Sequence, residues 1–292
     1  MTEQEWLASD DPAAMLRVVL HGEVTWKAGT PKPVVSKASD RKLRLFACAC
    51  CRQVWHLLTD ERSRRAVGVA EQWADLPPER QARTHRHRTH VFGRADRAYC
   101  ELVDGGVEQY HPARLAALAA RDTLQATGAG CCGEPLSGRM ERLGLRPAAQ
   151  AALLRDIVGN PFRPAACDPA WRTADVLALA RAAYDLRAVR VVAGDAGPSG
   201  LTGRPIEVSL EVEDGTLDHD RLAVLSDALE EAGCPSKWCR LCKGEKIIMV
   251  GEYRPLKCPC VEAGPHPLLA HLRSPGPHVR GCWALDLTLG KE

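Results

Sequence analysis

Apolar side chains along residues 1–190 recur at the three- and four-residue spacing of amphipathic helices. The clearest example runs from Asp40 to Leu58, with Ser39 as its expected N-cap. Similar patterns predict helices over residues 6–20, 59–74, 80–103, 112–126, 148–158 and 173–188. One face of the Asp40–Leu58 segment collects Leu43, Phe46, Ala47, Cys50, Val54, Leu57 and Leu58. We therefore predict a helical domain over residues 1–190.

The pattern changes after this domain. Residues 191–217 are rich in glycine and proline, and Ile206–Val212 alternates apolar and polar positions with the period of a half-buried strand. Residues 218–292 return to helical spacing and are expected to pack on the helical core. The predicted fold class is mainly α, a helical core with a small β element and an inserted zinc-ribbon hairpin.

The ribbon is predicted from two pairs of cysteines. Cys239 and Cys242 are separated by two residues, and Cys258 and Cys260 by one, with a short strand-like run between the pairs. Two such pairs on opposite sides of a hairpin can bind zinc tetrahedrally. We therefore predict a zinc ribbon inserted at residues 235–265.

Alternatives to this ligand set remain open. The second pair is tighter than the usual Cys-x-x-Cys, so Cys234 and His266 are reserve ligands, and reduced thiols without metal are the remaining possibility. Four thiolates leave no open position for water. The zinc is therefore expected to be structural, and a catalytic zinc is disfavoured.

The ribbon segment also carries a resemblance. The runs Cys239-Arg-Leu-Cys242-Lys-Gly244 and Cys258-Pro-Cys260-Val-Glu-Ala-Gly264 resemble half of a DnaJ-type cysteine-rich zinc region. The second repeat of that region has no counterpart here. The resemblance implies zinc and carries no chaperone activity over.

Three longer blocks carry a second resemblance: 39–64, 153–164, and 222–233 together with 271–283. They resemble a family of uncharacterised bacterial proteins that occur in several copies within large genomes. Members of that family run almost directly from the Ala-Gly-Cys segment at 232–234 to the His-Leu-Arg segment at 271–273. The resemblance therefore implies that the ribbon is an insertion into a helical fold, and it brings no activity with it.

Composition excludes several classes of protein. The chain has 292 residues, of which 45% are hydrophobic and 26% charged, with a net charge of +2. These values fit a globular protein and argue against a strongly basic nucleic-acid binder. No secretory signal and no apolar run of roughly 18–20 residues is visible, so we expect a cytoplasmic protein without a membrane partner. The 13 cysteines are then expected to be thiols or metal ligands.

Two further clusters are candidate sites. Cys48, Cys50 and Cys51 share one predicted helix, with Cys50 on its apolar face, Cys51 at the edge and Cys48 on the far flank, so we expect packing and no shared metal. Residues 80–97 hold six arginines, three histidines and one acid, Asp96. A solvated helix face is the favoured interpretation. The alternative is contact with a nucleic-acid backbone, for which the candidate residues are Arg83, Arg86, Arg88 and Arg94.

Enzyme motifs are sparse in this sequence. His278 and Cys282 could act as a base and a thiol nucleophile, which requires that both side chains share a pocket. The leading hypothesis is a non-enzymatic interaction or scaffold protein with a structural zinc site and a protein partner. A nucleic-acid-binding protein using the ribbon and residues 80–97 is the first alternative, and an enzyme using His278 and Cys282 is the second.

Overall fold

The structure is a computed structural model. It describes residues 1–21, 24–27, 30–33, 38–125, 134–184, 188–191, 207–210, 215–237, 247–250, 254–257 and 264–291. Twelve α-helices lie within these ranges, so the predicted mainly α fold class is confirmed.

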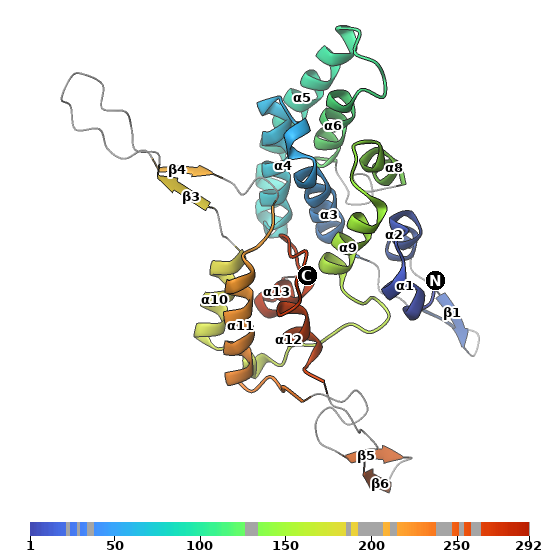
Figure 1. Cartoon of the computed structure of the whole chain (residues 1–292), viewed down its shortest axis with the longest axis vertical. Coiled ribbons are helices and arrows are strands. Elements are labelled where there is room, and N and C mark those ends of the chain that lie inside the picture. The colour runs from blue at the N-terminus through green and yellow to red at the C-terminus, as the bar shows by residue number, and fades with distance from the viewer. Residues whose placement is uncertain are drawn as a thin grey trace, which may run out of the picture.

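Eight of the described helices form the N-terminal part of the molecule, with α3 among them (Figure 1). Ser39 caps α3 as expected, since its side chain accepts a hydrogen bond from the Lys42 amide. Helices α4, α6, α8 and α9 all contact α3. The eight are α1 (Glu3–Ala8), α2 (Pro12–His21), α3 (Asp40–Gln53), α4 (Glu61–Ala74), α5 (Pro78–Asp104), α6 (Pro112–Asp122), α8 (Glu134–Arg142) and α9 (Pro147–Val158).

The cysteines of α3 are all buried. Cys48 is 1% exposed, and Cys50 and Cys51 are completely covered. This burial extends to the far flank of the helical wheel, where the sequence placed Cys48. Its cause is the position of α3: a helix covered from several directions has no flank left for solvent, even though its sequence is amphipathic.

Four helices build a second hydrophobic core, seen beside the first in Figure 1. They are α10 (Ala174–Tyr184), α11 (His219–Glu231), α12 (Pro267–Leu272) and α13 (Trp283–Leu289). Leu222, Leu225 and Leu229 follow each other at helical spacing on α11 and are fully buried in this core. Short 3-10 turns lie at Trp55–Leu57 and Pro169–Trp171.

Three antiparallel pairs of short strands complete the described elements. β1 (Val24–Lys27) pairs with β2 (Thr30–Pro33), β3 (Ala188–Val191) with β4 (Glu207–Leu210), and β5 (Ile247–Val250) with β6 (Arg254–Lys257). The fold class rests on the helices. The small β element and the zinc ribbon stay predictions, because the cysteines that define the ribbon lie outside the described residues.

The two ends of the proposed insertion meet on the second core. Cys234 is buried there, and the His266 amide donates to the Pro235 carbonyl at 3.0 Å. The chain therefore leaves this core after Pro235 and returns to it at His266. As for membrane contact, none of the described helices has the length and apolar character that crossing a bilayer requires.

Candidate metal centre

Four potential metal ligands come together between the two cores. Asp156 belongs to the last turns of α9, His271 to α12, His278 to the loop that follows, and Cys282 is the N-cap residue of α13. Their ligand atoms all lie within 4.8 Å of one another. Among the residues described, this is the one group of three or more His, Cys, Asp or Glu side chains with such a geometry.

Asp156 is the centre of the group. Its Oδ1 lies 2.9 Å from His271 Nε2 and 3.1 Å from His278 Nδ1. Cys282 Sγ lies 3.2 Å from His271 Nε2 and 4.0 Å from His278 Nδ1. Neighbouring ligands around a tetrahedral zinc ion are about 3.3–3.8 Å apart, given metal–ligand bonds of about 2.0–2.3 Å. The four separations given above, from 2.9 to 4.0 Å, lie on both sides of that range, and the two shortest are hydrogen-bond distances.

The loop between α12 and α13 orients these ligands. The amide of Val279 donates to Asp156 Oδ2 at 2.9 Å, which fixes the carboxylate. His278 Nε2 lies 3.0 Å from the carbonyl oxygen of Ser274. A carbonyl only accepts, so Nε2 is the donor, and in the neutral ring Nδ1 then carries a lone pair toward Asp156. Histidines that bind metals commonly donate their other ring N–H to a backbone carbonyl, which fixes the orientation of the ring.

Hydrogen bonds and charge outweigh burial in setting the pKa values of Asp156 and His278. The side chains of Asp156 and His278 are each 2% exposed, and that of His271 is 19% exposed. Burial alone would raise the pKa of Asp156, but hydrogen bonds and charge from His271 and His278 lower it. Burial would lower the pKa of His278, but its bond and charge pairing with Asp156 raise it. Protonation of His278 at Nδ1 is one way to satisfy the ring and the Asp156 carboxylate. A metal cation between the two groups is the other.

The thiol of Cys282 favours its neutral form in the absence of a metal. Burial, followed by the charge of Asp156, raises its pKa well above the usual value. A nucleophilic cysteine needs a lowered pKa. A bound metal would reverse this preference, because the thiolate is the form that coordinates and the cation compensates its charge.

The donor set suits a transition metal. Two imidazole nitrogens, one carboxylate oxygen and one sulfur are ligands that zinc accepts, whereas calcium and magnesium prefer oxygen alone. Four protein ligands complete a tetrahedral shell and leave no position for a substrate. The residues present therefore fit a closed metal centre.

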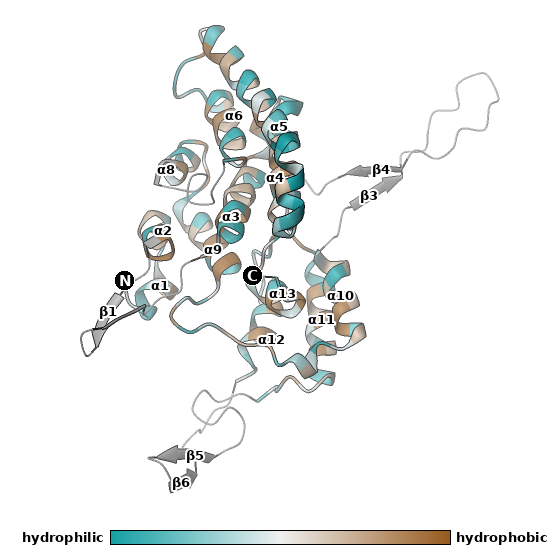
Figure 2. Ribbon diagram, turned by 180° about the vertical axis from the view of Figure 1, so that it is seen from behind, coloured by the Kyte–Doolittle hydropathy of each residue, from teal (hydrophilic) through white to brown (hydrophobic). Residues whose placement is uncertain are grey.

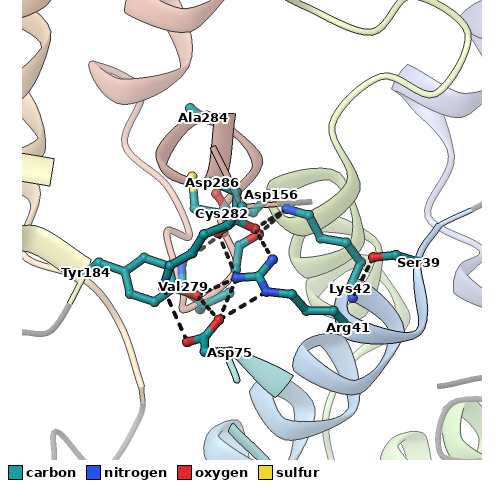
Figure 3. Close-up of polar contacts among 12 residues, drawn as sticks. Ser39, Arg41, Lys42, Asp75, Asp156, Tyr184, Val279, Cys282, Ala284 and Asp286 are labelled. Carbon is teal, nitrogen blue, oxygen red and sulfur yellow. Dashed lines mark hydrogen bonds and ion pairs between the residues drawn. The ribbon is translucent and has the colours of Figure 1, made fainter. Parts of the chain in front are cut away.

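An ion-pair network lies next to this centre and also joins the two cores (Figure 3). Arg41 of α3 reaches Asp286 of α13 at 2.7 Å and Asp75, just after α4, at 2.7 Å. Lys42 also pairs with Asp286. Asp75 also pairs with Arg280 at 2.6 Å and accepts a hydrogen bond from the Tyr184 hydroxyl at 3.0 Å. Asp286 is 1% exposed, so these charges lie inside the interface and not on its rim.

The residues predicted from the sequence have different outcomes. Cys239, Cys242, Cys258 and Cys260 lie outside the described residues. Of the reserve ligands, Cys234 is buried, and burial together with neighbouring charges raises its pKa to about 12. His266 caps α12, because its Nδ1 accepts from the Leu268 amide at 3.2 Å. Both side chains thus have packing roles in the second core.

The structure brings His278 and Cys282 into one buried site, as the enzyme alternative required, but with a thiol of raised pKa. Sequence reasoning missed Asp156 and His271. The spacing of His271, His278 and Cys282 within one loop was a visible signal for the histidine. Asp156 lies more than a hundred residues away in sequence, and no local pattern marks it.

The four candidate arginines of α5 divide into two kinds. Arg83, Arg86 and Arg94 are exposed, whereas Arg88 is 8% exposed and donates to the Leu124 carbonyl at 2.7 Å. Assigning Arg88 to a nucleic-acid-binding face is therefore contradicted by its burial. Its helical position is shared with Val91 and Ala95, which are also buried.

Comparison with known proteins adds no assignment. No protein-family model, no curated protein and no solved structure matches the chain. The family resemblance and the DnaJ-type resemblance therefore stay hypotheses.

Proposed function

We propose that the chain is a non-enzymatic scaffold protein whose two helical cores are joined by a structural zinc ion at Asp156, His271, His278 and Cys282. One observation carries the proposal: Asp156 of α9 and three potential ligands from residues 271–282 converge in a buried position, with all four ligand atoms within 4.8 Å of one another. Zinc is the preferred ion because it accepts nitrogen, oxygen and sulfur in one tetrahedral shell.

A structural role is favoured over a catalytic one by the closed ligand set. A catalytic zinc keeps one position for water or substrate. Here each of the four positions has a protein ligand, and Cys282 and Asp156 are buried. The predicted ribbon cysteines would hold a second zinc, and the partner of such a scaffold is proposed to be a protein.

The test is the metal content of the full chain purified in the presence of zinc. We expect two zinc ions per chain, one in the buried centre and one in the ribbon. The double variant His271→Ala and Cys282→Ala should lose one, and Cys242→Ser with Cys258→Ser should lose the other. Cys100→Ser is the matched control, because this exposed cysteine lies on α5 away from both sites and should lose none.

Replacing zinc by cobalt tests the identity of the ligands by absorption spectroscopy, independently of the stability of the variants. The ribbon variant should still bind one cobalt ion, with tetrahedral bands and a thiolate-to-metal charge-transfer band of single-sulfur intensity. Adding Cys282→Ala should remove that band. Full zinc content in the His271→Ala and Cys282→Ala variant would contradict the buried centre.

A further inference from the structure

Helix α5 presents a row of basic side chains to solvent. Its 27 residues begin at Pro78, and positions 83, 86, 90, 94 and 97 follow at spacings of three or four. This spacing places them on one side of the helix. We call this row the α5 basic face, and all five of its members are exposed; they are Arg83, Arg86, His90, Arg94 and Arg97.

A different side of α5 is the one that packs. Val91, Ala95 and Ala98 are buried against the N-terminal core, and Arg88 lies with them. The basic face therefore has no part in holding α5 in place. The first half of the helix is hydrophilic almost throughout (Figure 2).

Three arginines of the face lack counter-charges within the described structure. The side chains of Arg83, Arg86 and Arg94 make no ion pair or hydrogen bond with any described residue. The nearby acids are engaged elsewhere or lie at an end of the face. Asp96 pairs with Arg121, Glu101 pairs with Arg62, and Glu79 precedes the face in the first turn. The simple interpretation of a solvated face balanced by acids therefore does not describe these three side chains.

We propose that the α5 basic face binds the phosphate backbone of a double-stranded nucleic acid without reading its bases. From Arg83 to Arg97 the face extends about 21 Å, at about 1.5 Å per residue. One duplex strand carries a phosphate about every 3.4 Å along its axis, so the face spans roughly six phosphates. Because another side of α5 is packed, the helix lies along the outside of the backbone and does not enter a groove.

The chemistry of this face favours phosphate contact over base recognition. Arginine forks match phosphate oxygens. Duplex DNA and duplex RNA share the phosphate chemistry, so the test includes both. The proposal does not depend on the metal centre.

Binding is measured by fluorescence anisotropy with the full chain and labelled duplexes of DNA and RNA of the same sequence, between about 50 and 200 mM salt. The test variant combines Arg83→Gln, Arg86→Gln and Arg94→Gln. Arg181→Gln is the control, since Arg181 is exposed on α10 in the other core. Zinc content and helical circular dichroism are recorded on the same samples, so loss of the metal centre is distinguished from loss of the face.

We expect wild-type protein and the Arg181 variant to bind alike, and the triple variant to bind roughly 100-fold more weakly at about 100 mM salt. The slope of log affinity against log salt should fall by about 2.7 in magnitude, about 0.9 for each lost phosphate contact. The duplex that the protein binds with the higher affinity shows whether the natural ligand is DNA or RNA. Failure of both duplexes to bind at low salt, or unchanged binding by the triple variant, overturns the proposal. Binding only to anionic lipid vesicles, tested in parallel, also overturns it.

Discussion

At the scale of single residues, Gly281 shapes the loop that carries the candidate metal ligands. It directly precedes Cys282 and has a φ of +92°, a conformation that side-chain-bearing residues rarely adopt. A Cβ atom placed there would lie 2.7 Å from Leu45 Cδ1 and 3.1 Å from Leu45 Cβ. The loop can therefore pass close to α3 only because this position carries no side chain.

Gly281→Ala is expected to destabilise the protein by about 2–3 kcal/mol, through backbone strain and the contact with Leu45. Zinc occupancy should fall as well, since Cys282 would be displaced. The matched control is Gly93→Ala on α5, where the new methyl group meets no atom within 4 Å. This change should stabilise the protein by about 0.5–1 kcal/mol, as expected for an exposed helix. Urea denaturation measures both, and equal effects of the two changes would contradict the strain at Gly281.

At the scale of elements, the end of α6 is held by two buried arginines. Arg44 of α3 donates to the carbonyls of Thr123 and Gln125 at 2.6 and 2.7 Å, and Arg88 of α5 donates to that of Leu124. Both guanidinium groups lie under 5 Å from the Trp73 ring centroid, at 4.6 and 4.7 Å. Carbonyl groups at a helix C-terminus lack partners within the helix, and cations there satisfy them.

This arrangement predicts different effects for two arginines of the same helix. Arg88→Gln should cost about 1–3 kcal/mol of unfolding free energy, because it leaves a buried carbonyl without its donor. Arg83→Gln removes the same charge at an exposed position and should stay within about 0.5 kcal/mol. Thermal and urea denaturation of the two variants provide the comparison. A neutral effect of Arg88→Gln would show that the contact with α6 contributes little.

At the scale of the whole molecule, polar groups join the two cores. Asp75 faces Arg41, Arg280 and Lys291 across the interface. Burial would raise its pKa, but the charges of Arg280, Arg41 and Lys291 outweigh burial and lower it. A carboxyl with a lowered folded-state pKa stabilises the fold above its unfolded-state pKa of about 3.9, and this contribution is lost as the pH falls further.

Asp75→Asn should therefore cost about 3 kcal/mol at neutral pH, since it removes the buried negative charge that Arg41, Arg280 and Lys291 share. The difference from wild type should shrink below about pH 4, where the wild-type carboxyl also becomes protonated. Asp227→Asn is the control: this carboxylate is exposed and pairs with Arg273 at the surface, so the change should stay below about 1 kcal/mol. Urea unfolding at neutral and acid pH measures both. A difference that does not change with pH would argue against charge as the cause.

The insertion can be tested at the same scale. Since the His266 amide bonds to the Pro235 carbonyl, residues 236–265 can be replaced by a short glycine linker without moving either core. Helical circular dichroism and a cooperative transition should be retained, and one zinc ion should remain in the buried centre. Loss of the transition would show that the segment is part of the fold.

The helices could be predicted from the sequence because their apolar spacing is local. The burial of Cys48 and Arg88 could not, since it depends on which neighbours cover a helix. The pattern near the C-terminus placed His278 and Cys282 close together, but only the folded chain adds Asp156 of α9. The predicted ribbon site is local in sequence, and its cysteines lie outside the described residues.

The placement of the metal ligands has a consequence for synthesis on the ribosome. Asp156 is translated well before His271, His278 and Cys282, yet it is buried beside them in the finished protein. The N-terminal core, which can form first during translation, therefore holds a carboxylate without its partners until the last residues emerge. A chain ending before residue 264 should be cut by protease near α9 faster than the full chain, and zinc should not protect it. Equal resistance of the two chains would show that the first core matures on its own.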